Sequence, residues 1–302
     1  MFYDKLCKVL ASDRIKRDED MGRHITFRTG GTADYYVEPG DAGELAAVLE
    51  LCRSEDMPCY ILGNGSNLLV SDRGYHGVIV AMRSKSWSGI WTEGTRIRAG
   101  AGALLSATAK HALDASLTGL EFAAGIPGTL GGAVVMNAGA YGSEMKQVLV
   151  AATVLTGEGE VLTLEAKDLE LGYRTSCILR KGYVVLEAEL ELERGEADKI
   201  RAAMDDLAAQ RKSKQPLEYP SAGSTFKRPE GYFAGKLIQD AGLRGFRVGG
   251  AQVSEKHCGF VINRDHATAA DVMSLCREVQ RRVYEETGVA MEMEVKTLGE
   301  FD

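Results

Sequence analysis

The chain has 302 residues, a net charge of −7, and 45% hydrophobic and 26% charged residues. This composition is typical of a globular protein of about two domains and excludes a disordered chain. The negative charge argues against general nucleic-acid binding. No run approaches the roughly 18 apolar residues of a membrane span. Asp4 and Lys5 lie where a signal peptide would be apolar, so we expect a cytoplasmic protein that is not bound to membranes.

The cysteines and histidines show no metal-binding pattern. The six cysteines are scattered and form no C-x-x-C pair, and the five histidines lack metal-ligand spacing. We therefore expect free thiols in a reducing compartment and no metal. Nothing in the sequence indicates an obligate protein partner.

The first half of the chain predicts helices and strands in alternation. Residues 41–55 predict a helix capped by Asp41. Strands at 60–62 and 68–70 flank the turn GNGSN, and no helix follows those glycines. Strands at 149–156 and 161–165 flank GEGE, which indicates a hairpin.

The strict alternation of residues 186–193 predicts a strand with one wet face, and residues 196–211 have helical spacing. The two prolines within 213–220 indicate a linker.

The last third predicts its own helices and strands. These are a helix at 234–241, a strand at 260–263, a helix from Thr268 to Thr287, and a strand at 289–298. In the last strand, Glu292 and Glu294 would share the polar face.

Two glycine-rich segments stand out, although the P-loop and the complete G-x-G-x-x-G fingerprint are absent. One is residues 62–70, and the other is residues 119–142, with seven glycines and a single charge, Glu121. Backbone N–H groups of glycine segments can approach an anion closely and bind a pyrophosphate without lysine. The alternative is that these glycines only form tight turns.

Basic residues are concentrated between 211 and 256, where nine Lys or Arg accompany four Asp or Glu. Such a segment in an acidic protein fits an anionic small substrate, or else a solvated mixed surface. Within it, SAGSTFKRP surrounds Ser224 with small residues that would leave its hydroxyl accessible, although a loop serine is commonly a turn residue.

Seven segments together resemble the UDP-N-acetylenolpyruvoylglucosamine reductase family, in the family's order and over nearly the whole chain. They are FRTGGTADYYVEP (27–39), LGNGSNLLVSD (62–72), GLEFAAGIPGTLGGAVVMNAGAYG (119–142), YRTS (173–176), SAGSTFKRP (221–229), AGKLIQDAGLRGFRVGGAQVSEKHCGFVIN (234–263) and MEMEVKTLG (291–299). Without a tyrosine-bearing insertion after YRTS, the chain resembles the family's shorter type. Cys258 and Lys296 depart from the residues expected at those positions, alanine and arginine.

The resemblance implies an α+β fold. An FAD-binding domain of the vanillyl-alcohol-oxidase type would comprise subdomains 1–82 and 83–212, and a C-terminal αβ substrate-binding domain would comprise 213–302. The final residues would pack back on the first subdomain.

The resemblance also implies site residues. Ser224 would protonate C2 of the substrate, while Arg174 and Glu294 would polarise its carboxylate. FAD would contact Gly63, Asn64, Gly65, Ser66, Asn67, Gly125, Ile126, Pro127, Gly131, Gly132, Ala133 and Asn137. The substrate would contact Arg211, Lys214, Lys227, Arg228 and Gln252.

The implied activity is NADPH-dependent reduction of UDP-N-acetylglucosamine enolpyruvate to UDP-N-acetylmuramate with bound FAD, in peptidoglycan precursor synthesis. Two alternatives remain at this point. One is an FAD oxidoreductase of the same fold that acts on an alcohol or hydroxy acid. The other is a flavin- or UDP-sugar-binding protein without turnover.

Overall fold

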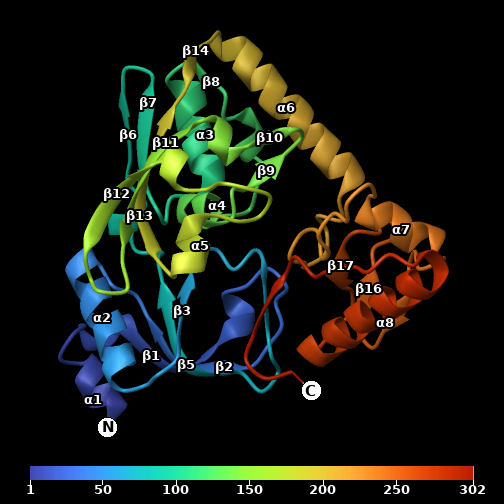
Figure 1. Cartoon of the computed structure of the whole chain (residues 1–302), viewed down its shortest axis with the longest axis horizontal. Helices are drawn as coiled ribbons and strands as arrows, with labels where there is room; N and C mark the ends of the chain where they lie inside the picture. Colours follow the sequence, from blue (N-terminus) through green and yellow to red (C-terminus); the bar gives the residue numbers. More distant parts are fainter. Residues whose placement is uncertain (302) are drawn as a thin grey trace. The chain divides into compact units, whose positions relative to one another are not determined.

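The computed structural model describes residues 1–301 and has an α+β fold (Figure 1). The chain forms two compact units, each built from segments distant in sequence. Unit 1 comprises Met1–Lys16, Tyr36–Asn64 and Val78–Arg211. Unit 2 comprises Arg17–Tyr35, Gly65–Gly77 and the chain from Lys212 onward. Among the described residues, no helix is both long enough and apolar enough to cross a membrane.

A four-stranded sheet has the order β1 (Ile15–Asp20), β2 (Thr32–Val37), β5 (Tyr75–Ala81), β3 (Cys59–Leu62). The strands β3 and β5 are parallel. The helix α1 (Phe2–Leu6) precedes this sheet, and α2 (Ala42–Ser54) connects β2 to β3. The predicted cap of α2 is confirmed, because the Asp41 carboxylate accepts a 2.9 Å hydrogen bond from the N–H of Glu44.

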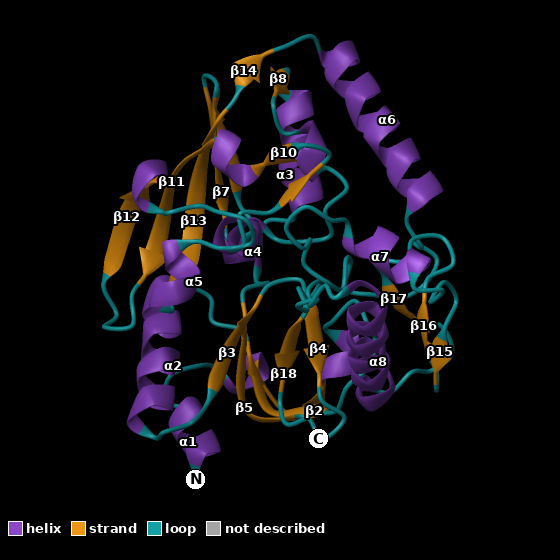
Figure 2. Ribbon diagram, turned by 45° about the vertical axis from the view of Figure 1, so that its right-hand side comes forward, coloured by secondary structure: helices purple, strands orange, loops and turns teal. Residues whose placement is uncertain are grey.

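An antiparallel five-stranded sheet forms the main framework of unit 1 (Figure 2). Its order is β12 (Val161–Glu165), β11 (Leu149–Leu155), β13 (Val184–Glu191), β7 (Arg96–Gly100), β6 (Ile90–Glu93). The predicted hairpin is therefore confirmed as β11–β12, and the alternating segment as β13. Buried side chains of β7, β11 and β13 and of the neighbouring helices form the core.

Short elements complete unit 1. They are the helices α3 (Leu105–Asp114), α4 (Leu130–Val135) and α5 (Cys177–Lys181), the pair β8 (Leu117–Thr118) with β14 (Glu193–Arg194), and the pair β9 (Gly139–Ala140) with β10 (Ser143–Glu144). Because α4 packs on β13 and α3 packs on α4, the glycine-rich segment that contains α4 lies against the sheet.

Unit 2 contains a three-stranded sheet of β15 (Arg247–Val248), β16 (Ala251–Val253) and β17 (Val261–Asn263), with α7 (Ala234–Asp240) and α8 (Ala269–Thr287). The predicted helix from Thr268 is confirmed as α8, and its start is a capping box, since Thr268 and Asp271 bond each other's backbone N–H groups. The Asp72 carboxylate also accepts from two N–H groups of the first turn of α8. The beginning of α8 is thereby held by two segments of unit 2.

The prediction of a continuous strand over 289–298 is wrong. Only β18 (Lys296–Leu298) is a strand, and it pairs in parallel with β4 (Leu68–Val70). Before β18 the chain has a different partner, because Met293 forms an isolated bridge with Phe226. The segment therefore changes partners along its length and cannot form one ladder.

The helix α6 (Ala197–Lys214) continues beyond the predicted end at residue 211 and includes the first residues of the predicted linker. The boundaries proposed for the three domains stay a prediction.

Candidate functional site

In unit 1, the residues Gly63 and Asn64 pack against the second glycine-rich segment. The Asn64 amide donates a 2.8 Å hydrogen bond to the carbonyl of Pro127. A Cβ atom at Gly63 would lie 2.5 Å from Oγ1 of Thr129. Glycine at position 63 therefore permits the approach of the two segments that sequence analysis predicted to act together.

The adjacent glycines of α4 have different surroundings. Gly131 is buried, and a Cβ there would lie 2.8 Å from the Cβ of Ala101, so this glycine serves packing. Gly132 is exposed, and a Cβ there would meet only Oγ1 of Thr129, at 3.6 Å. Close packing thus explains Gly131, whereas the outer side of Gly132 is open to a ligand.

Several backbone donors remain available along these segments. Within residues 1–301, the N–H groups of Gly63, Asn64 and Thr129 donate no hydrogen bond to another residue. Backbone N–H groups that donate to no protein acceptor favour an anion such as a pyrophosphate. The donor set therefore fits the phosphates of a dinucleotide.

The remaining predicted cofactor residues of unit 1 are more strongly engaged by the protein. The buried Asn137 amide donates to Glu144 and to the carbonyl of Gly172, and its oxygen accepts from the N–H of Lys146. Its side chain therefore orders the loop after α4 and has no donor left over. Ala133 is buried, and the N–H of Ile126 bonds back to Ala123.

Two predicted arginines also lie in unit 1. Burial lowers the pKa of Arg211, which lies against Gly125, and no described carboxylate forms an ion pair with it. A desolvated guanidinium in this state favours an anionic ligand. Arg174 has a φ of 55° and its guanidinium lies 5.2 Å from the ring centroid of Tyr173.

The rest of the GNGSN turn belongs to unit 2. Gly65 has a φ of 61°, and a Cβ there would lie 2.3 Å from the carbonyl oxygen of His24. The Asn67 amide donates a 3.2 Å hydrogen bond to the carbonyl of Glu294. Ser66 has no hydrogen-bond partner for its hydroxyl among the described residues. The structure thus brings a predicted cofactor residue, Asn67, beside a predicted catalytic residue.

Thr225 links the two predicted catalytic residues of unit 2, because it follows Ser224 in the chain and bonds the backbone of Glu294. The carbonyl of Thr225 accepts a 2.8 Å hydrogen bond from the N–H of Glu294, and its own N–H donates to Gly259 at 2.8 Å. The hydroxyl of Thr225 accepts from the N–H of Val261 at 2.9 Å. Ser224 therefore remains exposed on a backbone that is tied on both sides.

The expectation that Glu292 and Glu294 share a polar, solvated face is wrong, because Glu294 is buried. Glu294 is only 8% exposed, whereas the Glu292 side chain is 72% exposed and forms an ion pair with Lys227. The backbone of both residues bonds the same segment, Thr225 to Lys227, so the difference in burial arises from what packs against each side chain. The two carboxylates are thus distinguished by burial as well as by sequence position.

The predicted substrate residues of unit 2 have partners that the sequence did not reveal. Lys227 pairs with Glu292, and the Arg228 Nε–H donates to the carbonyl of Tyr232 at 3.2 Å. The Gln252 amide donates to the carbonyl of Gly245 at 3.1 Å. Lys214 is the last residue of α6.

His257 was not predicted as a site residue, although it lies within the segment SEKHCGF. Its Nδ1 accepts a 3.1 Å hydrogen bond from the N–H of Gly259, and Gly259 is the residue that bonds Thr225. Burial lowers the pKa of His257. In the sequence, no metal-ligand or catalytic spacing identifies this histidine as a site residue.

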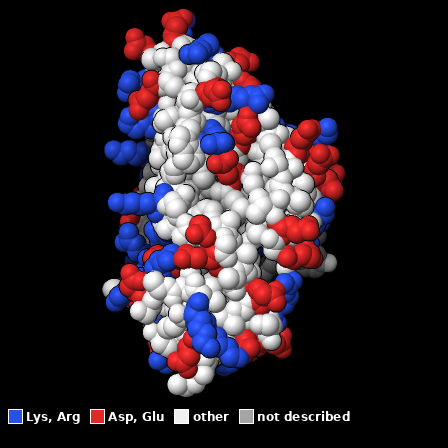
Figure 3. Space-filling model, turned by 90° about the vertical axis from the view of Figure 1, so that its left-hand side faces the viewer, with Lys and Arg blue, Asp and Glu red and all other residues white. Residues whose placement is uncertain are grey.

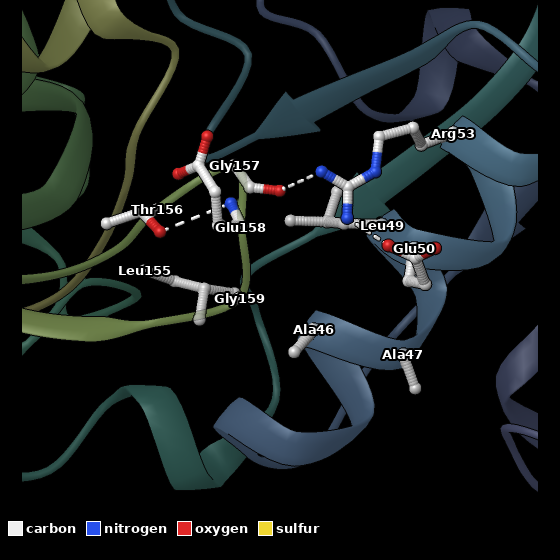
Figure 4. A pocket seen from close by; sticks show the side chains of 10 residues that line it. All are labelled: Ala46, Ala47, Leu49, Glu50, Arg53, Leu155, Thr156, Gly157, Glu158 and Gly159. Carbon is white, nitrogen blue, oxygen red and sulfur yellow. Dashed lines mark hydrogen bonds and ion pairs between the residues drawn. The ribbon is translucent and has the colours of Figure 1, made fainter.

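A cavity of about 280 Å³ lies elsewhere in unit 1, between α2 and the turn of the β11–β12 hairpin (Figure 4). The Arg53 side chain extends across it and donates to the carbonyl of Gly157 at 2.6 Å. None of the predicted site residues lines it. Among residues 1–301 there is also no cluster of side chains suited to a metal.

Two family models match the chain in separate regions. The model of the UDP-N-acetylenolpyruvoylglucosamine reductase C-terminal domain matches residues 215–298, and that of an FAD binding domain matches residues 33–165.

Relatives match over almost the whole chain. A UDP-N-acetylenolpyruvoylglucosamine reductase of Agathobacter rectalis is 55% identical, with 99% of each chain covered. That of Clostridium perfringens is 51% identical, with 99% of this chain and 97% of the relative covered.

Solved structures agree with the relatives. UDP-N-acetylenolpyruvylglucosamine reductase from Thermus caldophilus is 34% identical with a TM-score of 0.79, covering 95% of this chain and 99% of that one. The glucose dehydrogenase Phl p 4.0202 is 14% identical with a TM-score of 0.51, covering 65% of this chain and 44% of that one, and shares the fold alone.

Proposed function

The chain belongs to the UDP-N-acetylenolpyruvoylglucosamine reductase family, and we propose that it is the NADPH-dependent, FAD-containing enzyme that reduces UDP-N-acetylglucosamine enolpyruvate to UDP-N-acetylmuramate. The observation that carries this proposal is identity above 50% over 99% of the chain to relatives of that name. The matched FAD binding domain supports the cofactor. A purely binding protein or an alcohol oxidoreductase is not favoured by these relatives.

Bound FAD supplies the hydride carrier between NADPH and substrate. The free N–H groups of Gly63, Asn64 and Thr129 and the open side of Gly132 fit its pyrophosphate. In unit 2, the predicted contacts are Gly65, Ser66 and Asn67. The remaining predicted contacts, among them Gly125, Ile126 and Pro127, and Gly131, Ala133 and Asn137, would contribute backbone atoms or packing.

The reaction adds hydride to C3 of the enolpyruvyl group and a proton to C2. Negative charge therefore develops at C2 and its carboxylate before the proton arrives. We assign the proton to the Ser224 hydroxyl, whose exposure on a fixed backbone suits transfer to a bound substrate. The roles of Arg174 and Glu294 rest on the family resemblance. A fixed cation beside the carboxylate would stabilise the developing charge.

Substrate binding is assigned to Arg211, Lys214, Lys227, Arg228 and Gln252. The half-buried cation of Arg211 is the best supported, because it has no carboxylate partner among the described residues. To bind the substrate, Lys227 would have to leave or share its ion pair with Glu292. Gln252 would likewise have to leave or share its hydrogen bond to the carbonyl of Gly245.

The cellular role follows from the reaction. Its product is a precursor of peptidoglycan, so the enzyme would support cell-wall synthesis, and through it cell shape and division. All six cysteines are free thiols, which supports a cytoplasmic location because that compartment keeps thiols reduced.

The test is a visible spectrum of the purified protein. Flavin absorbance should bleach with NADPH and return when the enolpyruvyl sugar is added without oxygen, with UDP-N-acetylmuramate as product. Bleaching without recovery on adding that sugar would contradict the proposed substrate. A colourless protein that does not take up FAD would contradict the cofactor.

A further inference from the structure

A closed loop follows the Ser224 segment in unit 2. The Arg228 Nε–H donates to the carbonyl of Tyr232, and the N–H of Tyr232 donates to the carbonyl of Pro229 at 3.1 Å. Gly231 has a φ of 78°, which a turn this tight requires and which glycine adopts without strain. The loop therefore holds Phe233, the residue before α7, in a defined position.

The ring of Phe233 is stacked yet exposed. The Arg228 guanidinium carbon lies 3.9 Å from the ring centroid, while the residue as a whole is 62% exposed. Exposed phenylalanine contributes nothing to a core, and its apolar surface costs free energy in water. One face of the ring thus lies against a cation, and the residue remains open to a planar ligand.

The position of the ring relative to Ser224 follows from a chain of contacts. Gly235, two residues after Phe233, lies against Gly259, because a Cβ at Gly235 would be 3.1 Å from the N of Gly259. The carbonyl of Gly259 accepts from the N–H of Thr225, which follows Ser224. The ring and the serine hydroxyl therefore belong to one local region of unit 2.

We propose that Phe233 is the stacking platform for the uracil ring of the UDP-sugar, with Arg228 orienting the platform and serving the attached phosphates. This inference rests on the proposed function, since it assumes a UDP-linked substrate whose reacting end meets Ser224. The base and the reacting enolpyruvyl group are at opposite ends of the sugar nucleotide, so the base needs a platform on a loop separate from the serine but in the same part of unit 2, as Phe233 is. Stacking on an aromatic face and a guanidinium suits a nucleobase bearing a diphosphate.

The experiment compares two probes that differ only in the base. UDP and ribose 5-diphosphate are titrated calorimetrically into FAD-loaded wild-type protein and the Phe233→Ala variant. The variant should bind UDP about 5- to 150-fold more weakly, the range expected for loss of one base–aromatic stack. Its affinity for ribose 5-diphosphate should stay within about twofold of wild type, and Phe233→Trp should retain UDP binding.

The matched control is Tyr284→Ala, which removes an aromatic ring of similar exposure, 59%, from α8 in the same unit. It should bind UDP as wild type does. In turnover, Phe233→Ala should raise KM for the enolpyruvyl sugar with little change in kcat, and NADPH should still bleach the flavin at the wild-type rate.

Three results would overturn the inference: unchanged UDP affinity in Phe233→Ala, equal weakening of both probes, or equal loss of NADPH and UDP affinity. Failure of the proposed function would appear separately, as wild-type protein that does not turn over the enolpyruvyl sugar.

Discussion

Ser224 is exposed although Thr225 and Phe226, which follow it, are almost completely buried. This contrast arises because the backbone of Thr225 is bonded to two separate segments while the serine side chain points away from the core. A hydroxyl on such a support is positioned without being shielded, which suits a group that must meet a substrate.

Replacement of Ser224 should separate the two half-reactions. Because the serine proton is needed only after hydride reaches C3, Ser224→Ala should leave flavin bleaching by NADPH nearly unchanged. Recovery on adding the enolpyruvyl sugar should slow by about 10²- to 10⁴-fold. Stopped-flow absorbance measures both steps, with Ser274→Ala, an exposed serine of α8, as control. Equal slowing of both steps would leave Ser224 only a positioning role.

The two neighbouring glutamates provide a second residue-scale test. Glu294 is buried beside the Ser224 segment, whereas Glu292 is exposed and paired with Lys227. Glu294→Gln should therefore slow recovery of flavin absorbance by at least about tenfold more than Glu292→Gln. Comparable rates in the two variants would contradict the assignment of Glu294.

At the scale of elements, α4 shows which glycines can be tested without disturbing the fold. A side chain at Gly65 or Gly131 would collide with protein atoms, so flavin loss in such variants would have two explanations. A side chain at Gly132 would extend outward from α4. A substitution at Gly132 therefore tests whether a ligand binds there without also disturbing the packing of the protein.

Gly132→Val should fold normally and contain much less flavin than wild type, because its side chain would occupy the space that the cofactor approaches. The control is Gly157→Val in the same unit, where a Cβ meets no atom within 4 Å. Flavin content is measured by absorbance after purification, and folding by circular dichroism. Normal flavin content in Gly132→Val would place the pyrophosphate elsewhere.

The junction of α2 and β3 has a chemical property of its own. The buried Cys52 thiol at the end of α2 donates a hydrogen bond to Cys59 at the start of β3, which lowers the pKa of Cys59 to about 7. Thiolate is the reactive form, so Cys59 should be half ionised near neutral pH.

Alkylation of Cys59 by iodoacetamide should therefore rise with pH around a midpoint near 7, as followed by peptide mass spectrometry. Removing the donor in Cys52→Ala should move this midpoint upward, toward the ordinary thiol value of about 8.5. The exposed Cys7 serves as an internal reference in both proteins. An unmoved midpoint would show that Cys52 does not stabilise the thiolate.

At the scale of the whole molecule, charge is unevenly distributed along a chain of net charge −7. On the face drawn in Figure 3, acidic and basic side chains both occur and are interspersed with uncharged surface. The basic excess of residues 211–256 is a local feature, which fits an anionic small molecule better than a nucleic acid.

Arg228→Ala should raise KM for the UDP-sugar by about 10- to 100-fold, because a charge-assisted contact is worth about 1.5–3 kcal/mol. Added salt should raise the wild-type KM as well, through screening. Arg277→Ala, which removes an exposed arginine of α8, is the control in steady-state assays. Equal KM values for the two variants would show that Arg228 is a solvated surface charge that does not bind the substrate.

Local sequence patterns determined the elements that depend on local interactions. Asp41 and Thr268 mark helix starts and Gly288 a helix end, because caps act within a few residues. Alternation identified β13, and the ordered motifs identified the family. These features need no distant partner to be recognised.

Tertiary structure decided whatever depends on a partner far along the chain. Residues 289–298 alternate like a strand, but their pairing passes from the Ser224 segment to residues near β4, so only three residues form a ladder. The burial of Glu294, the ion pair of Lys227 and the stacking of Phe233 follow from the same folding of the chain. Periodicity reports which side chains alternate, whereas burial depends on what packs against them, and only the folded chain supplies that.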